Sequence, residues 1–235
     1  MRYCSRRVSL ILVSCLAVAA VARAQDFQGG LQFMLGVPQT DFASSVGRNG
    51  YGLTGQIGFA PGRAPFFVGV ELGFMNYGSE KRQEPFSTTI PDVTVDVTTS
   101  NNFFTGMAMI RLQPNRGMFR PYAELVAGVN YLFTTTEIDN RGRGGEEVAS
   151  STNVDDAAFA YGAGGGVMLR VYEASDDTDG IREVLIDFRT RYTRGGEAQY
   201  LKEGSIRREN GRVTYDVVTS STDLLSFHIG VSLRF

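Results

Sequence analysis

Apolar and polar residues alternate with a period of two along eight segments of this chain. The last segment, SFHIGVSLRF, carries its large apolar residues at every second position: Phe227, Ile229, Val231, Leu233 and Phe235. Successive side chains of a β-strand point to opposite faces, so this alternation predicts strands with one apolar and one polar face. We expect no convincing amphipathic helix after residue 25. The eight predicted strands cover residues 27–37, 51–60, 66–77, 103–112, 120–133, 158–172, 184–192 and 226–235.

The connections between the predicted strands alternate in length. The short connections are residues 61–65, 113–118 and 173–183, and the long polar ones are residues 38–50, 79–102, 134–157 and 193–222. Short turns at one rim and long loops at the other are typical of barrels that cross the outer membrane. We therefore predict an all-β fold, a transmembrane antiparallel up-and-down β-barrel of eight strands. The even strand number places both ends of the barrel at the short-turn rim, on the periplasmic side.

The charged residues test this assignment, because an Arg or Lys that faces lipid at the bilayer midplane costs about 2–4 kcal/mol. Every charged residue in the middle of a predicted strand lies on the face opposite the apolar residues: Glu71, Arg111, Glu124, Arg170, Asp187, Arg189, Arg191 and Arg234. This distribution favours a polar interior and a lipid-facing exterior. The alternative, a soluble barrel or β-sandwich, would carry its apolar face inside.

The first 24 residues resemble a cleaved secretory signal peptide. Three arginines precede the apolar run VSLILVSCLAVAAVA, and the small-residue motif ARA precedes Gln25. A positive start, a short apolar run and such a cleavage motif are the three parts of a signal peptide. We expect residues 25–235 to form the barrel domain in the cell outer membrane. A lipoprotein signal at Cys15 and a twin-arginine signal at SRR are alternatives, but the apolar run continues past Cys15 to the ARA motif.

Removal of residues 1–24 changes both the charge and the cysteine content. The remaining chain has 19 basic and 25 acidic residues, a formal charge of −6, which argues against nucleic acid as a partner. Both cysteines leave with the signal peptide, so we expect neither disulfides nor thiolate metal ligands. The single histidine argues against a transition-metal site, and we expect no metal and no cofactor.

With these strands assigned, the chain resembles the small eight-stranded outer-membrane barrels, the group of the OmpA transmembrane domain and OmpX. The resemblance rests on RPYAELVAGVNY, AYGAGGGVMLR and the terminal HIGVSLRF, and it extends over residues 25–235. It implies membership of the outer membrane protein β-barrel family of Gram-negative bacteria. Unlike full-length OmpA, this chain is expected to have no periplasmic peptidoglycan-binding domain, because nothing follows Phe235. The resemblance also implies that the last strand is the signal for the barrel-assembly machinery, through Phe227, Ile229, Val231, Leu233 and Phe235.

The inward charges are the first candidate site. Side chains fill the interior of an eight-stranded barrel, so charges inside it must be paired or hydrated. We expect an ionic plug that closes the lumen and fixes the strand register. A narrow channel for ions or small solutes is the alternative, and acid–base catalysis by paired carboxylates is less favoured because no substrate-sized cleft is implied. The expected interior network consists of Glu71, Arg111, Glu124, Arg170, Asp187, Arg189, Arg191, His228 and Arg234.

His228 and a glycine-rich segment are further candidates for chemistry. Outer-membrane lipid A deacylases use a His–Ser pair on the lipid-facing side, whereas His228, Ser226 and Ser232 all point inward here. A lipid-modifying enzyme is therefore the less favoured alternative, and we expect a non-enzymatic protein. GAGGG at residues 162–166 lacks the lysine and the following helix of a phosphate loop. We expect its inward glycines to make room for bulky side chains of neighbouring strands.

The long loops are the expected functional surface. PDVTVDVTTS suggests that the fourth strand extends beyond the membrane, and Asn210-Gly211 predicts a hairpin turn. Hairpin edges can pair with another strand, so we expect an extracellular partner at loops 79–102 and 193–222. The other expected partners of this monomer are outer-membrane lipid, lipopolysaccharide and the barrel-assembly machinery. Six acids in residues 134–156 suit divalent cations, although the solubility of an exposed loop explains them more simply.

Overall fold

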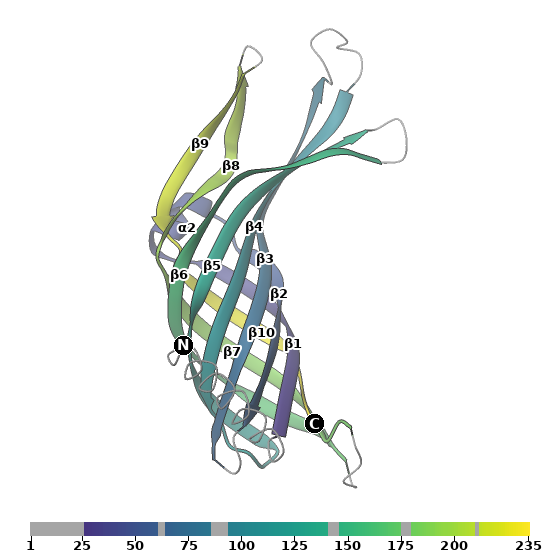
Figure 1. The fold of residues 1–235 in the computed structure, drawn as a ribbon, viewed down its shortest axis with the longest axis vertical. Helices are drawn as coiled ribbons and strands as arrows, with labels where there is room; N and C mark the ends of the chain where they lie inside the picture. The colour runs from purple at the N-terminus through teal and green to yellow at the C-terminus, as the bar shows by residue number, and fades with distance from the viewer. Residues whose placement is uncertain (1–25, 61–63, 86–93, 141–145, 175–179, 210–211) are drawn as a thin grey trace, which may run out of the picture.

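The computed structural model describes residues 26–60, 64–85, 94–140, 146–174, 180–209 and 212–235. Eight strands form a closed antiparallel barrel in the order β1-β10-β7-β6-β5-β4-β3-β2 (Figure 1). They are β1 (Asp26–Pro38), β2 (Gly50–Ala60), β3 (Phe66–Pro85), β4 (Thr94–Leu112), β5 (Phe119–Asn140), β6 (Glu146–Glu173), β7 (Glu183–Gly195) and β10 (Leu224–Arg234). The predicted eight-stranded barrel is confirmed, and each predicted strand coincides with part of one of these.

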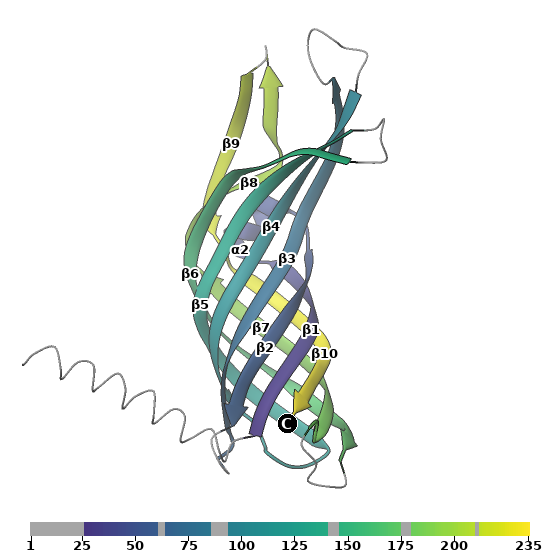
Figure 2. The ribbon, with the colours of Figure 1, turned by 45° about the vertical axis from the view of Figure 1, so that its right-hand side comes forward.

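The two rims of the barrel differ in their connections. Figure 2 shows that β1 begins and β10 ends at one rim of the barrel. Residues 113–118 join β4 to β5 at this rim, which we call the short-turn end. The opposite rim, the long-hairpin end, carries the extended strands and a helix. The closing pair of β1 and β10 runs from Gln28 opposite Arg234 to Pro38 opposite Leu224. This pairing closes the barrel wall, so the wall itself offers no edge for edge-to-edge aggregation.

The strands on one side of the barrel continue well beyond the closed wall. β3 and β4 stay paired out to Pro85 and Thr94, and β5 and β6 stay paired out to Asn140 and Glu146. The predicted extension of the fourth strand is therefore confirmed. The prediction of loops over residues 79–102 and 134–157 was wrong for most of their length, because strand pairing continues where the apolar alternation has faded.

A separate hairpin occupies most of the predicted loop at residues 193–222. It consists of β8 (Glu197–Glu209) and β9 (Arg212–Ser221), which pair only with each other (Figure 1). The last pair of this ladder is Glu209 opposite Arg212. The predicted turn at Asn210-Gly211 lies outside the described residues.

The connection between β1 and β2 contains a helix, α2 (Thr40–Val46), where no helix was expected. It has seven residues and buries one of them, Phe42, so it offers too few turns for an apolar periodicity to be recognised. Gly47 ends the helix in the left-handed conformation at φ 66°, which glycine adopts without steric cost. Within the described part of the chain, no helix is long and apolar enough to cross a membrane.

The inward glycines of GAGGG are needed for close approach of the strands. A Cβ on Gly164 would lie 2.7 Å from the carbonyl oxygen of Thr190 on β7. A Cβ on Gly166 would lie 2.7 Å from Cζ of Tyr122 on β5. The expectation that these glycines make room for bulky side chains thus holds in part for Gly166, which faces both the Tyr122 side chain and the carbonyl oxygen of Phe188, whereas Gly164 mainly accommodates the backbone of the neighbouring strand.

The outer face of the barrel is apolar and bounded by two aromatic rings. The exposed aromatic residues at the short-turn end include Phe27, Phe59, Phe66, Phe119, Tyr172 and Phe235. Those at the long-hairpin end include Tyr51, Phe74, Phe104, Phe159, Tyr161 and Tyr192. Exposed aliphatic side chains lie between the rings, among them Leu31, Ile57, Leu72, Leu125 and Val231. A continuous apolar belt with aromatic girdles is the surface of a barrel that is immersed in a lipid bilayer.

Candidate functional site

Five charged side chains meet in the middle of the lumen and form what we call the central ion cluster: Glu71, Arg111, Glu124, Arg189 and Arg191. Glu71 pairs with Arg189 at 2.6 Å and with Arg191 at 2.5 Å. Because β7 and β3 lie four strands apart in a ring of eight, these two pairs cross the lumen. They tie opposite walls of the barrel together.

Glu124 on β5 is the most highly connected acid of the central ion cluster. Its carboxylate lies 2.9 Å from Arg111, 2.6 Å from Arg191 and 3.7 Å from Arg189. The side chains of Glu124 and Arg111 are fully shielded from solvent. Charges buried this deeply are tolerated only where opposite charges and hydrogen bonds compensate them, so each member depends on the others.

Asp187 joins the central ion cluster through neutral side chains. It accepts hydrogen bonds from Tyr122 Oη at 2.7 Å and from Gln32 Nε2 at 2.5 Å. Gln32 Oε1 in turn accepts from Arg189 at 2.6 Å, and Gln56 Oε1 accepts from Arg111 at 2.9 Å. The sequence prediction missed Gln32, Gln56 and Tyr122 because it counted charges only, although the three share the same inward parity.

Arg111 is also held by aromatic rings. Its guanidinium carbon lies 4.2 Å from the ring centroid of Tyr122 and 5.3 Å from that of Phe67. Both distances are within the range of a cation–π interaction, which gains strength when the cation is desolvated. Ring faces and carboxylate together fix the guanidinium in one position and fill the space around it.

His228 lies beside the central ion cluster, and its hydrogen bonds define its tautomer. An arginine can only donate, so the contact of 3.0 Å between Arg189 Nη2 and His228 Nδ1 makes Nδ1 an acceptor. The hydrogen is then on Nε2, which donates to Ser226 Oγ at 2.9 Å. A histidine that donates to a serine cannot take that serine's proton, so the pair does not form an activated nucleophile.

A second set of ions, the short-turn ion cluster, is centred on Glu183 at the start of β7. Glu183 pairs with Arg120 at 2.5 Å, with Arg234 at 3.1 Å and with Arg170 at 3.3 Å. The prediction of one network is therefore corrected, because Arg170 and Arg234 gather here and not around Glu71 and Glu124. Glu183 was missed because it precedes the predicted strand at residues 184–192, and Arg120 was missed because it is the first residue of its predicted strand.

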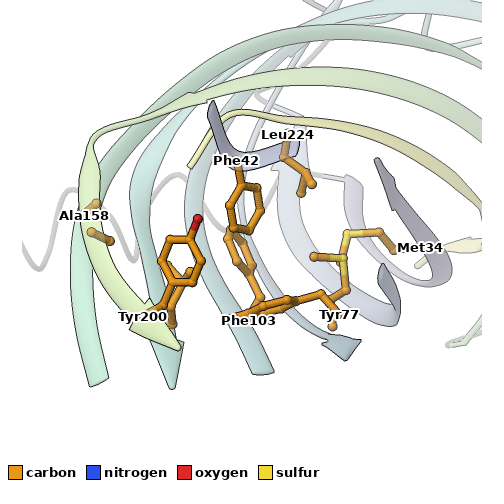
Figure 3. Close-up of a cluster of buried hydrophobic side chains, with 10 residues drawn as sticks. Met34, Phe42, Tyr77, Phe103, Ala158, Tyr200 and Leu224 are labelled. Atoms are coloured by element: carbon orange, nitrogen blue, oxygen red, sulfur yellow. The ribbon is translucent and has the colours of Figure 1, made fainter. Parts of the chain in front are cut away.

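The long-hairpin end of the lumen is closed by an apolar cap. Phe42 of α2 is fully buried and packs edge-on against Tyr200 of β8, with ring centroids 5.5 Å apart. It also contacts Tyr77 and Phe103, at centroid distances of 5.8 and 6.2 Å (Figure 3). The remaining buried members of the cap are Met34, Met75, Leu132, Ala158, Ala198 and Leu224. Helix α2 and the base of the β8–β9 hairpin thus cover the barrel mouth.

Two smaller apolar clusters fill more of the interior. One consists of Phe67, Met107, Met109, Val126 and Ala160, and the other of Tyr122, Met168 and Leu185. Within the described residues, no group of three or more His, Cys, Asp or Glu side chains is arranged to hold a metal ion. Ion pairing and packing account for the interior groups described above.

The alternating apolar residues of the last strand lie on the outer face. Phe227, Ile229, Val231 and Phe235 are exposed, and the ring of Phe235 packs against that of Phe27 with centroids 6.2 Å apart. The backbone N–H of Phe235 donates to the carbonyl oxygen of Phe27 at 2.9 Å. The role of Phe227, Ile229, Val231, Leu233 and Phe235 as an assembly signal stays a prediction.

Comparison with known proteins gives one family and several distant structures. The family model described as outer membrane protein beta-barrel domain matches residues 8–235. Neisserial surface protein A is similar at 12% identity and a TM-score of 0.41, over 90% of this chain and 96% of that chain. The attachment invasion locus protein Ail of Yersinia pestis is similar at 13% identity and a TM-score of 0.37, over 90% and 97% of the two chains. The N-terminal β-barrel domain of Pseudomonas aeruginosa OprF is similar at 11% identity and a TM-score of 0.35, over 90% and 98%. No curated protein matches the sequence.

Proposed function

The chain belongs to the outer membrane protein beta-barrel domain family, and from this premise we propose that it is a non-enzymatic outer-membrane barrel with a sealed lumen. Its role is carried by the strands and hairpin at the long-hairpin end, which faces the outside of the cell. There they contact an extracellular partner or contribute to envelope integrity. Export by the signal peptide at residues 1–24 and recognition by the assembly machinery are parts of the same proposal.

The observation that carries the proposal is the filling of the lumen at three levels. The apolar cap covers one end, the central ion cluster lies in the middle, and the short-turn ion cluster lies at the other end. Arg111, Arg189 and Glu71 are 0%, 2% and 1% exposed, so water has little access to the middle of the barrel. A channel would require a continuous wet path, and a closed ionic interior favours a structural barrel instead.

We expect the purified barrel to be silent in planar lipid bilayers. Phe42→Ala should be silent as well, because it thins the apolar cap but leaves both ion clusters in place. Single-channel recording at symmetric salt measures the current, with a boiled sample of the same preparation as the control. A reproducible open state in the unaltered protein that disappears in Arg189→Ala or Arg191→Ala would support the narrow channel and overturn the sealed lumen.

The hydrogen-bond pattern of His228 supports a non-enzymatic protein. Catalysis by a Ser–His pair requires the histidine to accept the serine proton and an acid to stabilise the resulting imidazolium. Here the histidine donates to Ser226, and its other nitrogen faces Arg189, a cation that opposes imidazolium formation. His228 and Ser226 are 4% and 3% exposed, so a membrane lipid has no access to either.

The long-hairpin end supplies the proposed interaction surface. β3 pairs with β2 no further than Asn76, and from Gly78 to Pro85 the described residues of β3 form their strand ladder with β4. The β8–β9 hairpin is anchored at its base by Tyr200, which is 1% exposed, and by Ala198. Strands that project beyond the barrel from a buried base can present backbone groups along their outer edge to an extended partner segment. This geometry supports the expected partner regions at residues 79–102 and 193–222.

An epitope tag between Asn210 and Gly211 should be labelled by antibody on intact cells. A tag in the turn at residues 113–118 is the matched control and should be labelled only after the outer membrane is permeabilised. Flow cytometry with both variants measures which end faces outward. Labelling of the 113–118 tag on intact cells would reverse the orientation and contradict the proposed surface.

A further inference from the structure

A groove of about 660 Å³ crosses the outer wall of the barrel. Its outward-facing walls come from four neighbouring strands, β1, β10, β7 and β6, and they include Phe33, Leu35, Phe227, Phe188, Thr190 and Gly165. Eight of the eleven lining residues have the lipid-facing parity, and the other three, Gly166, Arg189 and His228, point inward. The groove therefore opens toward the membrane. Its volume is within the range of about 300–1,000 Å³ that is common for ligand sites.

The groove exists because small residues meet at one place in an otherwise bulky wall. Gly165 of β6 pairs with Thr190 of β7, and Thr190 pairs with Phe227 of β10. On the short-turn side of this row, Val167 pairs with Phe188, and on the other side Ala163 pairs with Tyr192. Gly165 and Thr190 thus form the floor of a depression that larger side chains border.

The depth of the groove within the membrane follows from the aromatic girdles. Tyr192 belongs to the girdle at the long-hairpin end and lies two residues beyond Thr190, roughly 7 Å along the strand. Leu35 pairs with Tyr51, another member of that girdle. The groove therefore begins just beneath the interface of the outer leaflet and runs toward the bilayer centre.

From its place and its lining, we infer that the groove holds one acyl chain of an outer-leaflet lipid. The groove is continuous with the lipid-facing belt, and its outward side chains are apolar apart from Thr190, so hydrocarbon is the occupant that fits. Apolar burial gives no net driving force inside a bilayer, because lipid tails are as apolar as the wall. Shape and dispersion contacts with Phe33, Phe188 and Phe227 must then retain the chain.

A tryptophan reporter can test this inference, since the sequence contains no tryptophan. Phe188→Trp places the reporter in the groove, and Val70→Trp is the matched control on β3. Each lies two outward positions from an exposed girdle residue, Tyr192 and Phe74 respectively. The probe is 9,10-dibromostearate, a brominated acyl chain that quenches tryptophan on contact, titrated into each variant in detergent micelles.

The expected result is saturable quenching in Phe188→Trp and a linear, partition-like decrease in Val70→Trp. The quenching at saturation should be about threefold deeper in the groove, because a groove covers more of the chain than an open wall does. Adding Thr190→Phe, which fills the groove from an exposed position, should reduce the quenching to the control level. Adding Thr190→Val, which keeps the volume, should preserve it.

Equal, non-saturating quenching in both reporters would overturn the inference. So would saturable quenching that survives Thr190→Phe, since the chain would then be bound elsewhere. Heat-modifiable migration of every variant on gels verifies that the barrel is closed before titration. The inference depends on lipid immersion but not on a sealed lumen, so bilayer recordings that reveal a channel would leave it standing.

Discussion

Glu124→Gln should lower the free energy of unfolding by about 3–5 kcal/mol, the usual cost of removing one partner from a buried ion pair. The substitution preserves volume and leaves one carbonyl oxygen, but it removes the charge that compensates Arg111 at 2.9 Å and Arg191 at 2.6 Å. Urea unfolding of the barrel in lipid vesicles, followed by heat-modifiable migration and circular dichroism, measures the change.

The matched control for this experiment is Glu137→Gln on the same strand. Glu137 lies on β5 beyond the ion clusters and is exposed, so its replacement should change the unfolding free energy by less than about 0.5 kcal/mol. Replacing Arg111 by Met in the Glu124→Gln background should recover part of the loss, because it removes one of the uncompensated cations. If the two glutamine variants unfolded at the same urea concentration, the central ion cluster would not hold the barrel together.

The architecture could be predicted from the sequence because a membrane barrel imposes the same constraint on every strand. A one-residue error in register would turn Glu71, Arg111 or Glu124 toward lipid, so the alternation of charge and apolar residues had to be consistent in all eight segments. Because the pattern was consistent, it predicted the number of strands, the closure of the barrel by β1 and β10, and the inward orientation of the charges.

The sequence could not reveal which charges pair with which. The alternation along a strand assigns each residue to the inner or the outer face. The position of its side chain along the barrel axis depends instead on the tilt and stagger of the strands. Arg189 and Arg191 therefore reach Glu71 on the opposite wall, whereas Arg170 and Arg234, on the same face by parity, meet Glu183 at the rim. One predicted network proved to be two.

The cap at the long-hairpin end was unpredictable for a different reason. Phe42, Tyr77 and Tyr200 lie in three segments that had been assigned to loops or to a strand end, and no periodicity connects them. They are brought together by the closure of the barrel beneath them. A seven-residue helix such as α2 is stabilised by this packing, since isolated helices of that length are unstable in water.

The inner and outer faces of the barrel wall are subject to different physical requirements. Inside, specificity comes from charge pairs such as Glu71 with Arg189, which permit one register and exclude its neighbours. Outside, the wall has only to be apolar and to match the bilayer in height, so a depression such as the one at Gly165 and Thr190 can be tolerated and filled by lipid. Substitutions on the two faces should therefore destabilise the barrel for different reasons. On the outer face the harmful change is a new polar residue, and on the inner face it is a charge left without its partner.

Leu125→Arg is the corresponding test of the outer face. Leu125 is 66% exposed near the middle of the membrane-spanning part of β5, so an arginine there should lower the unfolding free energy in lipid vesicles by about 2–4 kcal/mol. Met118→Arg is the control, because Met118 is equally exposed at 70% but lies in the short turn before β5, where the cost should be about 0–1 kcal/mol. In a water-soluble barrel an arginine at either exposed position would be harmless. Equal unfolding free energies of the two variants would therefore contradict immersion of this wall in lipid. A larger loss of unfolding free energy in Leu125→Arg than in Met118→Arg would place Leu125 deeper in the bilayer than Met118.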